Sequence, residues 1–154
     1  MDRHALRSAV VIEDDDGIRS LIHAVLQRAG LNVIEAANGA DGIEAVRAHA
    51  PAIITVDIRM PGIDGFETTR RIREISDAAI IVLSAHVADA DESESLAAGA
   101  DVYMRKPFRP RELRAFVDER LRAARSAETQ AAGSERVSSS SQAKRPSDAS
   151  SPKR

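Results

Sequence analysis

The chain has 154 residues, 43% of them hydrophobic and only 3% aromatic, with a formal net charge of -2. These values predict one domain with an aliphatic core and some additional chain, and the small charge gives no general attraction to nucleic acid or membranes. Because the sequence contains no cysteine, disulfide bonds and thiolate metal sites are excluded.

No apolar stretch approaches the roughly 20 residues of a membrane span. The segment from Met1 to Arg7 leads directly into a short apolar run that ends in acidic residues, so it does not fit a signal peptide. We therefore expect a cytoplasmic protein that makes no membrane contact.

Taken in order, the chain opens with a strand followed by a helix. Residues 9–12 form an apolar run that predicts a buried strand, and the run ends in the acids Glu13 to Asp16. A helix follows, with Asp15 or Asp16 as its N-cap and Gly30 at its end. Helical spacing places five apolar residues on its inward face: Ile18, Leu21, Ile22, Val25 and Leu26.

The same alternation continues to the middle of the chain. Residues 31–36 predict a second strand, and residues 40–48 a short second helix. Residues 52–57 are apolar and rich in β-branched side chains, as expected of a strand buried on both faces. This third strand ends on a carboxylate, Asp57, and Pro61-Gly62 force a turn shortly afterwards.

Two more strands and three more helices follow. The fourth strand covers residues 79–83 and ends at Ser84, and the fifth covers residues 101–104, just before Lys106. Residues 88–98 predict a poor helix because acidic residues crowd it and Leu96 is its one large apolar residue. The third and last helices have inward positions at Phe66, Thr69, Ile72, Ile75, Leu113, Phe116, Val117 and Leu121.

This order predicts an α/β domain of five βα units over residues 1–125, with a doubly wound parallel sheet and helices on both faces. Residues 126–154 differ in composition: they contain nine Ser and two Pro, and Val137 is their one large apolar residue. Such a segment buries too little apolar surface to offset its ordering entropy. We therefore expect a disordered Ser-rich tail over these residues.

Four strand ends carry polar residues that parallel pairing would bring to one edge of the sheet: Glu13-Asp14, Asp57, Ser84 and Lys106. Neighbouring carboxylates raise one another's pKa, and Mg²⁺ relieves that repulsion by binding carboxylates, water and phosphate oxygens. The lysine and the hydroxyl could stabilise the oxygens of a transferring phosphoryl group, with one carboxylate as the nucleophile.

Each of these residues alone has an ordinary explanation. Glu13 and Asp14 would be helix-capping acids, Lys106 a solvated lysine, Ser84 a turn former and Asp57 a loop acid. Their joint placement at four strand ends favours a phosphoryl-transfer site instead.

At this point the chain resembles the response-regulator receiver domains of two-component signalling. The resemblance covers about residues 8–125 and implies a flavodoxin-like sheet of strand order 2-1-3-4-5. It is carried by Ile12-Glu13-Asp14, Val56 to Gly62, Asp64-Gly65, Leu83-Ser84-Ala85, Gly99-Ala100-Asp101 and Lys106-Pro107-Phe108.

The resemblance implies a role for each site residue. Asp57 would accept a phosphoryl group from a histidine kinase, and Mg²⁺ would be bound by Asp14, by Glu13 through water, by Asp57 and by the backbone carbonyl of Arg59. Ser84 and Lys106 would contact phosphoryl oxygens, and Tyr103 would be the switch aromatic. An edge-strand packing role is the alternative for Tyr103. Arg59 and His86, each two residues past a site residue, would tune the lifetime of the phosphoryl group.

The implied partners are a sensor histidine kinase or phosphotransfer protein and a downstream protein target that the sequence does not name. No output domain is recognised after residue 125, so the sequence leaves two alternatives: a stand-alone receiver that works by protein contact, or part of a longer chain. A dimer that forms on phosphorylation is a further expectation. The readout face would consist of residues 88–98, the fifth strand and the last helix.

Other functions remain open at this stage. The first alternative is a receiver-like module that signals by binding without phosphorylation. A metal-dependent phosphatase would need a second acid where Arg59 stands, and a dinucleotide enzyme would need glycine motifs that are absent. A nucleic-acid binder would have to use the modestly basic tail, which is more typical of a solvated appendage.

Overall fold

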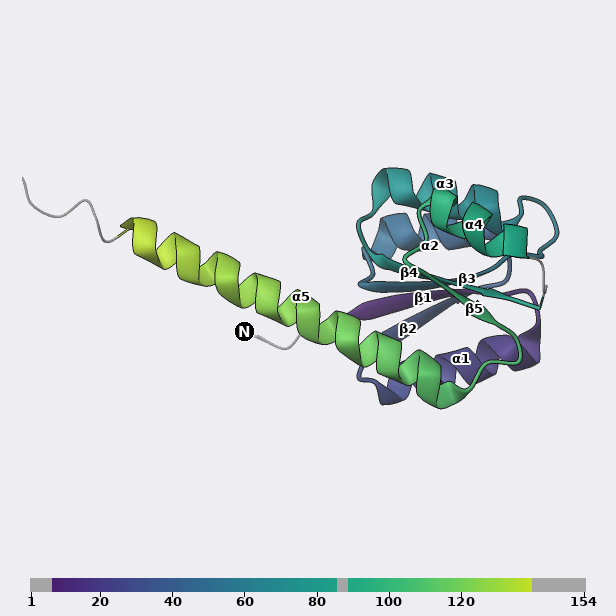
Figure 1. Cartoon of the computed structure of the whole chain (residues 1–154), viewed down its shortest axis with the longest axis horizontal. Helices are drawn as coiled ribbons and strands as arrows, with labels where there is room; N and C mark the ends of the chain where they lie inside the picture. Colours follow the sequence, from purple (N-terminus) through teal and green to yellow (C-terminus); the bar gives the residue numbers. More distant parts are fainter. Residues whose placement is uncertain (1–6, 86–88, 140–154) are drawn as a thin grey trace, which may run out of the picture. The chain divides into compact units, whose positions relative to one another are not determined.

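The computed structural model describes residues 7–85 and 89–139 (Figure 1). Strands and helices alternate along these residues: β1 (Ser8–Ile12), α1 (Asp16–Arg28), β2 (Asn32–Ala36), α2 (Gly39–His49), β3 (Ile53–Asp57), α3 (Gly65–Ile75), β4 (Ala79–Ser84), α4 (Asp89–Ala98), β5 (Val102–Arg105) and α5 (Pro110–Ser139). The strands form one parallel sheet in the order β2-β1-β3-β4-β5. The predicted doubly wound fold and its strand order are therefore confirmed.

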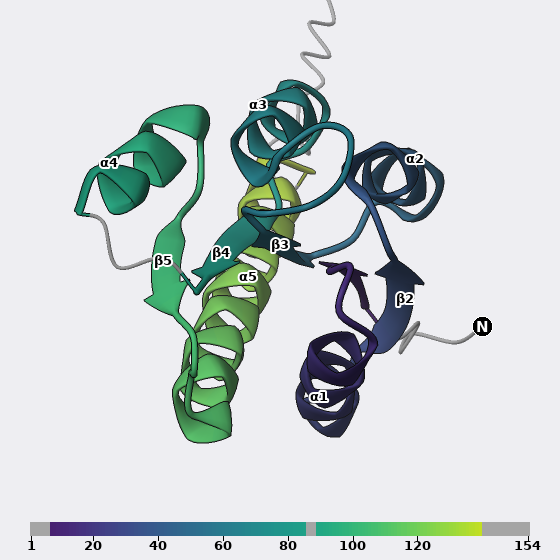
Figure 2. The same ribbon diagram turned by 90° about the vertical axis from the view of Figure 1, so that its right-hand side faces the viewer.

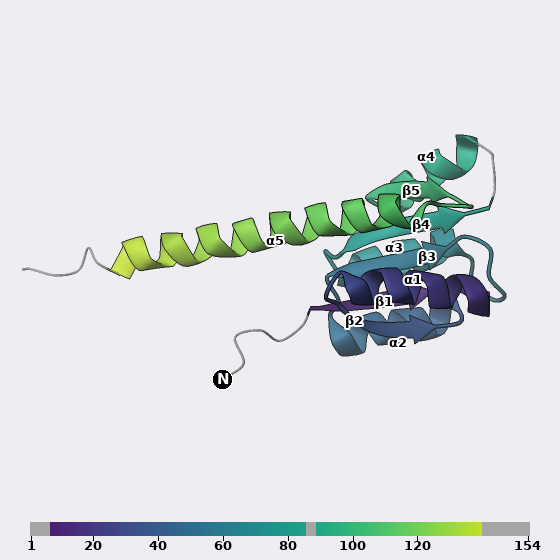
Figure 3. The same cartoon turned by 90° about the horizontal axis from the view of Figure 1, so that it is seen from below.

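Helices cover both faces of the sheet. α2, α3 and α4 lie on one face, while α1 and the first part of α5 lie on the other (Figures 1 and 2), and α1 crosses in front of the strands in Figure 3. Strand side chains alternate between these two layers, so that in β1 Ala9 and Val11 pack toward α1 and α5, and Val10 and Ile12 toward α2 and α3. Burial on both faces explains why the strand sequences are continuous apolar runs.

Among the side chains that the structure describes, three large apolar ones are exposed: Leu21, Ile75 and Leu96 are 44%, 43% and 46% exposed. The prediction that Leu21 and Ile75 face inward is wrong. In α1, Ile22 and its helical neighbours already fill the contact with the sheet, and Leu21 lies about 100° away around the helix. Ile75 is the last residue of α3, at the amino edge of the sheet where the strands begin.

The last helix is longer than the sequence predicted. α5 runs without a break to Ser139, whereas we expected a helix ending near Arg125 and disorder beyond it. A lack of apolar residues prevents a segment from packing in a core, but it does not prevent the segment from forming a helix. Residues 122–132 are rich in the strong helix formers Ala, Arg, Glu and Gln. The chain divides into a unit ending at Leu121 and a second unit from Arg122. Residues 140–154 lie outside the described part.

The helices α1, α2 and α3 begin with polar N-caps at the carboxyl edge of the sheet. The backbone N–H of Ile18 donates to Asp15 Oδ1 at 2.9 Å, and the N–H of Glu67 donates to Asp64 Oδ1 at the same distance. Asn38 caps α2 in the same way, and Gly30 has the positive φ of +91° expected after α1. These caps fix the loops that carry the candidate site residues.

Candidate functional site

The polar residues at the strand ends meet at the carboxyl edge of the sheet. Because β1, β3, β4 and β5 are neighbours in that order, their ends place Glu13, Asp57, Ser84 and Lys106 in a row. Carboxylate oxygens of Glu13, Asp14 and Asp57 all lie within 4.8 Å of one another. The sheet therefore brings together the acids that the sequence assigned to one site.

Lys106 is shared between two buried carboxylates. Its Nζ lies 2.9 Å from Glu13 Oε2 and 3.3 Å from Asp57 Oδ1. The side chains of Glu13 and Asp57 are 2% and 8% exposed, and that of Lys106 is 11% exposed. The lysine backbone is held as well, since its N–H donates to the Ser84 carbonyl at 2.7 Å. The peptide bond between Lys106 and Pro107 is cis.

Burial disfavours the charged form of both acids. It raises the pKa of Glu13 to about 7, while the hydrogen bond from Lys106 opposes the rise and the charge of Asp57 adds to it. Burial also raises the pKa of Asp57 above its ordinary value, against the attraction of Lys106, and Asp14 raises it further. One lysine does not neutralise three acids, so the site carries an excess of negative charge when all three are ionised.

The chemistry of the donors fits Mg²⁺. The three carboxylates are hard oxygen ligands, and oxygen ligands from a few carboxylates together with water and phosphate are the set that Mg²⁺ prefers. Asp14 is exposed beside the buried Glu13, so a cation could retain water or a phosphoryl oxygen on that side. The site could thus hold a divalent cation next to the Asp57 carboxylate.

The loop after Asp57 is closed by Gly65. Its N–H donates to the Ile58 carbonyl at 2.8 Å, and a Cβ at this position would lie 2.3 Å from the Asp57 carbonyl oxygen. Only glycine fits this approach, which explains the Asp64-Gly65 pair: the aspartate caps α3 and the glycine admits the strand end. Sequence reasoning used the pair as a motif and missed this packing role.

The other predicted residues have varied surroundings. Ser84 is buried at the end of β4, and Arg59 is exposed in the loop that follows β3. Tyr103 is half-buried on β5 and packs against the apolar layer under α2 and α3. His86 lies outside the described residues.

Arg73 on α3 is a structural residue that sequence reasoning missed. Its guanidinium donates to the Gly99 carbonyl at 2.7 and 3.0 Å and to the Ala78 carbonyl at 2.8 Å. It also pairs with Asp101 at 2.9 Å, and Asp101 in turn accepts from the Ile80 N–H at 2.8 Å. This network accounts for the Gly99-Ala100-Asp101 motif, and no spacing pattern in the sequence pointed to its arginine.

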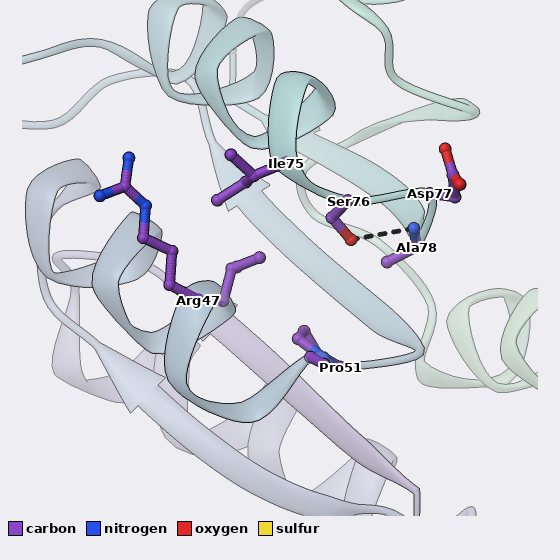
Figure 4. Close-up of a pocket in the computed structure, with 8 residues that line it drawn as sticks. Arg47, Pro51, Ile75, Ser76, Asp77 and Ala78 are labelled. Carbon is purple, nitrogen blue, oxygen red and sulfur yellow. Dashed lines mark hydrogen bonds between the residues drawn. The ribbon is translucent and has the colours of Figure 1, made fainter.

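A hollow of about 450 Å³ lies at the other end of the strands (Figure 4). It is lined by Val46, Arg47, Ala50, Pro51, Ile75, Ser76, Asp77 and Ala78. None of the candidate site residues contributes to it, so it is separate from the acidic site.

In the described residues, no helix is both long enough and apolar enough to cross a bilayer.

Comparison with known proteins agrees with this geometry. The sequence model of the response regulator receiver domain matches residues 9–118. The transcriptional regulatory protein AfsQ1 of Streptomyces coelicolor is 44% identical over 116 residues, and YvrH of Bacillus subtilis is 39% identical over 116 residues. Each alignment covers 75% of this chain but only 50% and 49% of the relatives, so the chain spans about half their length.

Solved structures resemble the same region. The chemotaxis protein CheY4 of Vibrio cholerae is 27% identical with a TM-score of 0.69, and the alignment covers 75% of this chain and 98% of that one. The beryllofluoride-activated DrrB receiver domain is 29% identical with a TM-score of 0.70, covering 76% and 98%. The fold, the clustered acids and the family match agree, and the chain belongs to the response regulator receiver domains of two-component systems.

Proposed function

We propose that this chain accepts a phosphoryl group on Asp57 from the phosphohistidine of a sensor histidine kinase or phosphotransfer protein, in an Mg²⁺-dependent reaction. The observation that carries the proposal is the buried ion-pair cluster: Asp57 shares Lys106 with Glu13, and carboxylate oxygens of Glu13, Asp14 and Asp57 lie within 4.8 Å of one another. We place this reaction in the cytoplasm and regard the domain as a signalling partner that assists its own phosphorylation and dephosphorylation.

Each residue of the site has a separate role in the proposed phosphoryl transfer. An Asp57 oxygen attacks phosphorus; the phosphorus–nitrogen bond of the donor breaks as the oxygen–phosphorus bond forms, and the released imidazole takes up a proton. Lys106 pairs with one phosphoryl oxygen and the Ser84 hydroxyl donates to another. Glu13, Asp14, Asp57 and the Arg59 carbonyl would hold Mg²⁺, which supplies charge neutralisation for the transferred group.

Intact-protein mass after incubation with a small phosphodonor tests the acceptor. Wild-type protein should gain one phosphoryl group with Mg²⁺ and none with a chelator, and Asp57→Asn should gain none. Asp64→Asn is the matched control, because Asp64 caps α3 in the same loop and asparagine caps a helix equally well. Uptake by Asp57→Asn at the wild-type yield would favour another acceptor, and no uptake by the wild-type protein would favour a module that acts by binding alone.

We further propose that phosphorylation is read out on α4, β5 and the first part of α5 by a downstream protein or a second copy. α4 offers weak packing, since its buried residues include Ser95 and Ala98 while Leu96 is 46% exposed, and such elements belong to the low-stability end of a domain. A phosphoryl group would draw Ser84 and Lys106 toward it. This movement would shift the ends of β4 and β5, and with them Tyr103 on β5.

Hydrogen exchange with and without beryllofluoride tests this readout. Protection should change in residues 84–108 and stay nearly constant in residues 18–29 and 40–48. Uniform protection of the whole domain, or a change confined to the loop after Asp57, would contradict it.

A further inference from the structure

The loop that carries Glu13 and Asp14 is tied to the fold by one arginine. Arg19, in the first turn of α1, donates from Nη1 to the backbone carbonyl of Glu13 at 3.0 Å. That carbonyl belongs to the peptide that joins Glu13 to Asp14. Its orientation therefore sets how the side chains of two consecutive acids, one buried and one exposed, lie relative to each other.

The guanidinium is anchored on two further sides. Nη2 donates to Asp16 Oδ1 at 2.5 Å, and Nε lies 3.8 Å from Glu35 Oε2 on β2. His23 approaches the other Glu35 oxygen at 3.2 Å. The Arg19 side chain is 17% exposed, so its planar fork spans the end of β1, the first turn of α1 and β2 at once.

We propose that Arg19 is a positioning residue for Mg²⁺: its guanidinium fixes the peptide between Glu13 and Asp14, so that the two carboxylates stay close enough to share the cation. The inference rests on the function proposed above and adds a residue outside the implied ligand set. Charge-assisted bonds to a carbonyl are stronger than neutral ones, and a fixed loop avoids the ordering cost of bringing two acids together when the cation binds.

The two ways in which Arg19 could act, through its charge or by positioning the ligands, predict opposite changes in Mg²⁺ affinity when Arg19 is removed. A positive charge beside the cluster repels a cation, so if Arg19 acted only through its charge, removing it would tighten Mg²⁺ binding. If Arg19 positions the ligands, removing it loosens the loop and weakens binding. Outer groups that orient metal ligands typically contribute about 10-fold or more to metal affinity.

The test is calorimetric titration of Mg²⁺ into the unphosphorylated full chain. Arg19→Met keeps the helix propensity and the aliphatic stem, and we expect its Mg²⁺ affinity to fall by about 10-fold. Arg19→Lys has a single ammonium that reaches only part of the network, so its Mg²⁺ affinity should lie between those of Arg19→Met and wild type. Arg47→Met is the matched control, because Arg47 is also a helical arginine paired three residues away, with Glu44, but lines the hollow at the opposite edge; its affinity should stay within about 2-fold of wild type.

A second readout needs no metal. In metal-free protein, backbone NMR relaxation of Asp14 and Asp15 should show increased motion in Arg19→Met, while α3 amides should not change. A folded Arg19→Met that binds Mg²⁺ as tightly as wild type, or more tightly, would overturn the inference. If that variant does not fold, Mg²⁺ binding by Arg19→Lys that is as tight as wild type, or tighter, would overturn it instead.

The two proposals fail in different ways. If wild-type protein binds Mg²⁺ but takes up no phosphoryl group, the proposed function is wrong and the role of Arg19 in metal binding is still measured. If wild type is phosphorylated and Arg19→Met has unchanged Mg²⁺ affinity and unchanged loop motion, only the role of Arg19 is wrong.

Discussion

One lysine serves two buried carboxylates at the carboxyl edge of the sheet. Lys106 lies 2.9 Å from Glu13 and 3.3 Å from Asp57, and the exposed Asp14 adds a third negative charge nearby. In water these acids would be ionised at neutral pH, but burial raises the pKa of Glu13 and Asp57. At the residue scale, ionisation of both acids in the metal-free site should therefore lower the stability of the folded protein.

We predict that the stability of the metal-free protein falls as the pH rises from about 4.5 to about 7. The pKa of Glu13 is about 7 in the folded state against an ordinary 4.5, so the folded state retains a proton that the unfolded chain releases in this window. The expected loss is on the order of 2 kcal/mol.

Thermal unfolding of wild type and Glu13→Gln at several pH values, in the presence of a chelator, measures this effect. The variant should show a shallower fall, because only Asp57 would still titrate abnormally, and Mg²⁺ should restore wild-type stability at the alkaline end. An equally steep fall in Glu13→Gln would show that Glu13 is not the group responsible.

At the scale of elements, Arg73 joins the end of α3 to the turns before β4 and β5. Its guanidinium contacts the carbonyls of Ala78 and Gly99 and the carboxylate of Asp101, and Gly99 has a φ of +115°. The same side chain therefore holds the entry to β5, the strand that leads to Lys106. The network links the packing of the smallest helix, α4, to the strand that ends at the site.

We predict that Arg73→Met lowers the free energy of unfolding by about 2–4 kcal/mol, because it leaves the part-buried carbonyls of Gly99 and Ala78 without their guanidinium donor and removes the ion pair with Asp101. Arg71→Met on the same helix is the control: Arg71 is 52% exposed and pairs with Glu67 on the surface, so the expected change is within about 0.5 kcal/mol. Urea denaturation measures both. Equal losses in the two variants would mean that the Arg73 network contributes no more than a surface ion pair.

At the scale of the whole molecule, the apolar face of α5 ends before the helix does. Leu113, Val117 and Leu121 are buried against the sheet, whereas the next part of the chain forms a separate unit from Arg122. Among the described side chains, the buried core residues therefore end at Leu121.

We predict that removal of residues 127–154 leaves cooperative unfolding intact, with a melting temperature within a few degrees of the full chain. Limited proteolysis should likewise leave a stable fragment that ends between about Leu121 and Ser134. Loss of cooperative melting in the shortened chain would mean that the second unit stabilises the first.

The sequence predicted those features that depend on local pattern. The strand ends and the strand order could be predicted because few folds are compatible with fully apolar runs that carry these motifs at their carboxyl ends. Asp57, Glu13 and Lys106 accordingly lie together as expected. Arg19 and Arg73 could not be predicted, since their partners are backbone carbonyls that only the folded chain brings near. The exposure of Leu21 depends on how much of the helix face the sheet covers, which periodicity alone does not give. The extension of α5 depends on helix propensity, which the apolar pattern does not report.

The most direct measurement of the central claim is to locate the phosphoryl bond itself. An aspartyl phosphate is reduced by borohydride to homoserine, and peptide mass spectrometry then identifies the residue that was modified. Protein treated with a phosphodonor and Mg²⁺ should yield homoserine at position 57 and at no other acid of the cluster, with none when Mg²⁺ is removed. Homoserine at position 13 or 14, or an unmodified Asp57 in protein that has gained a phosphoryl group, would contradict the account.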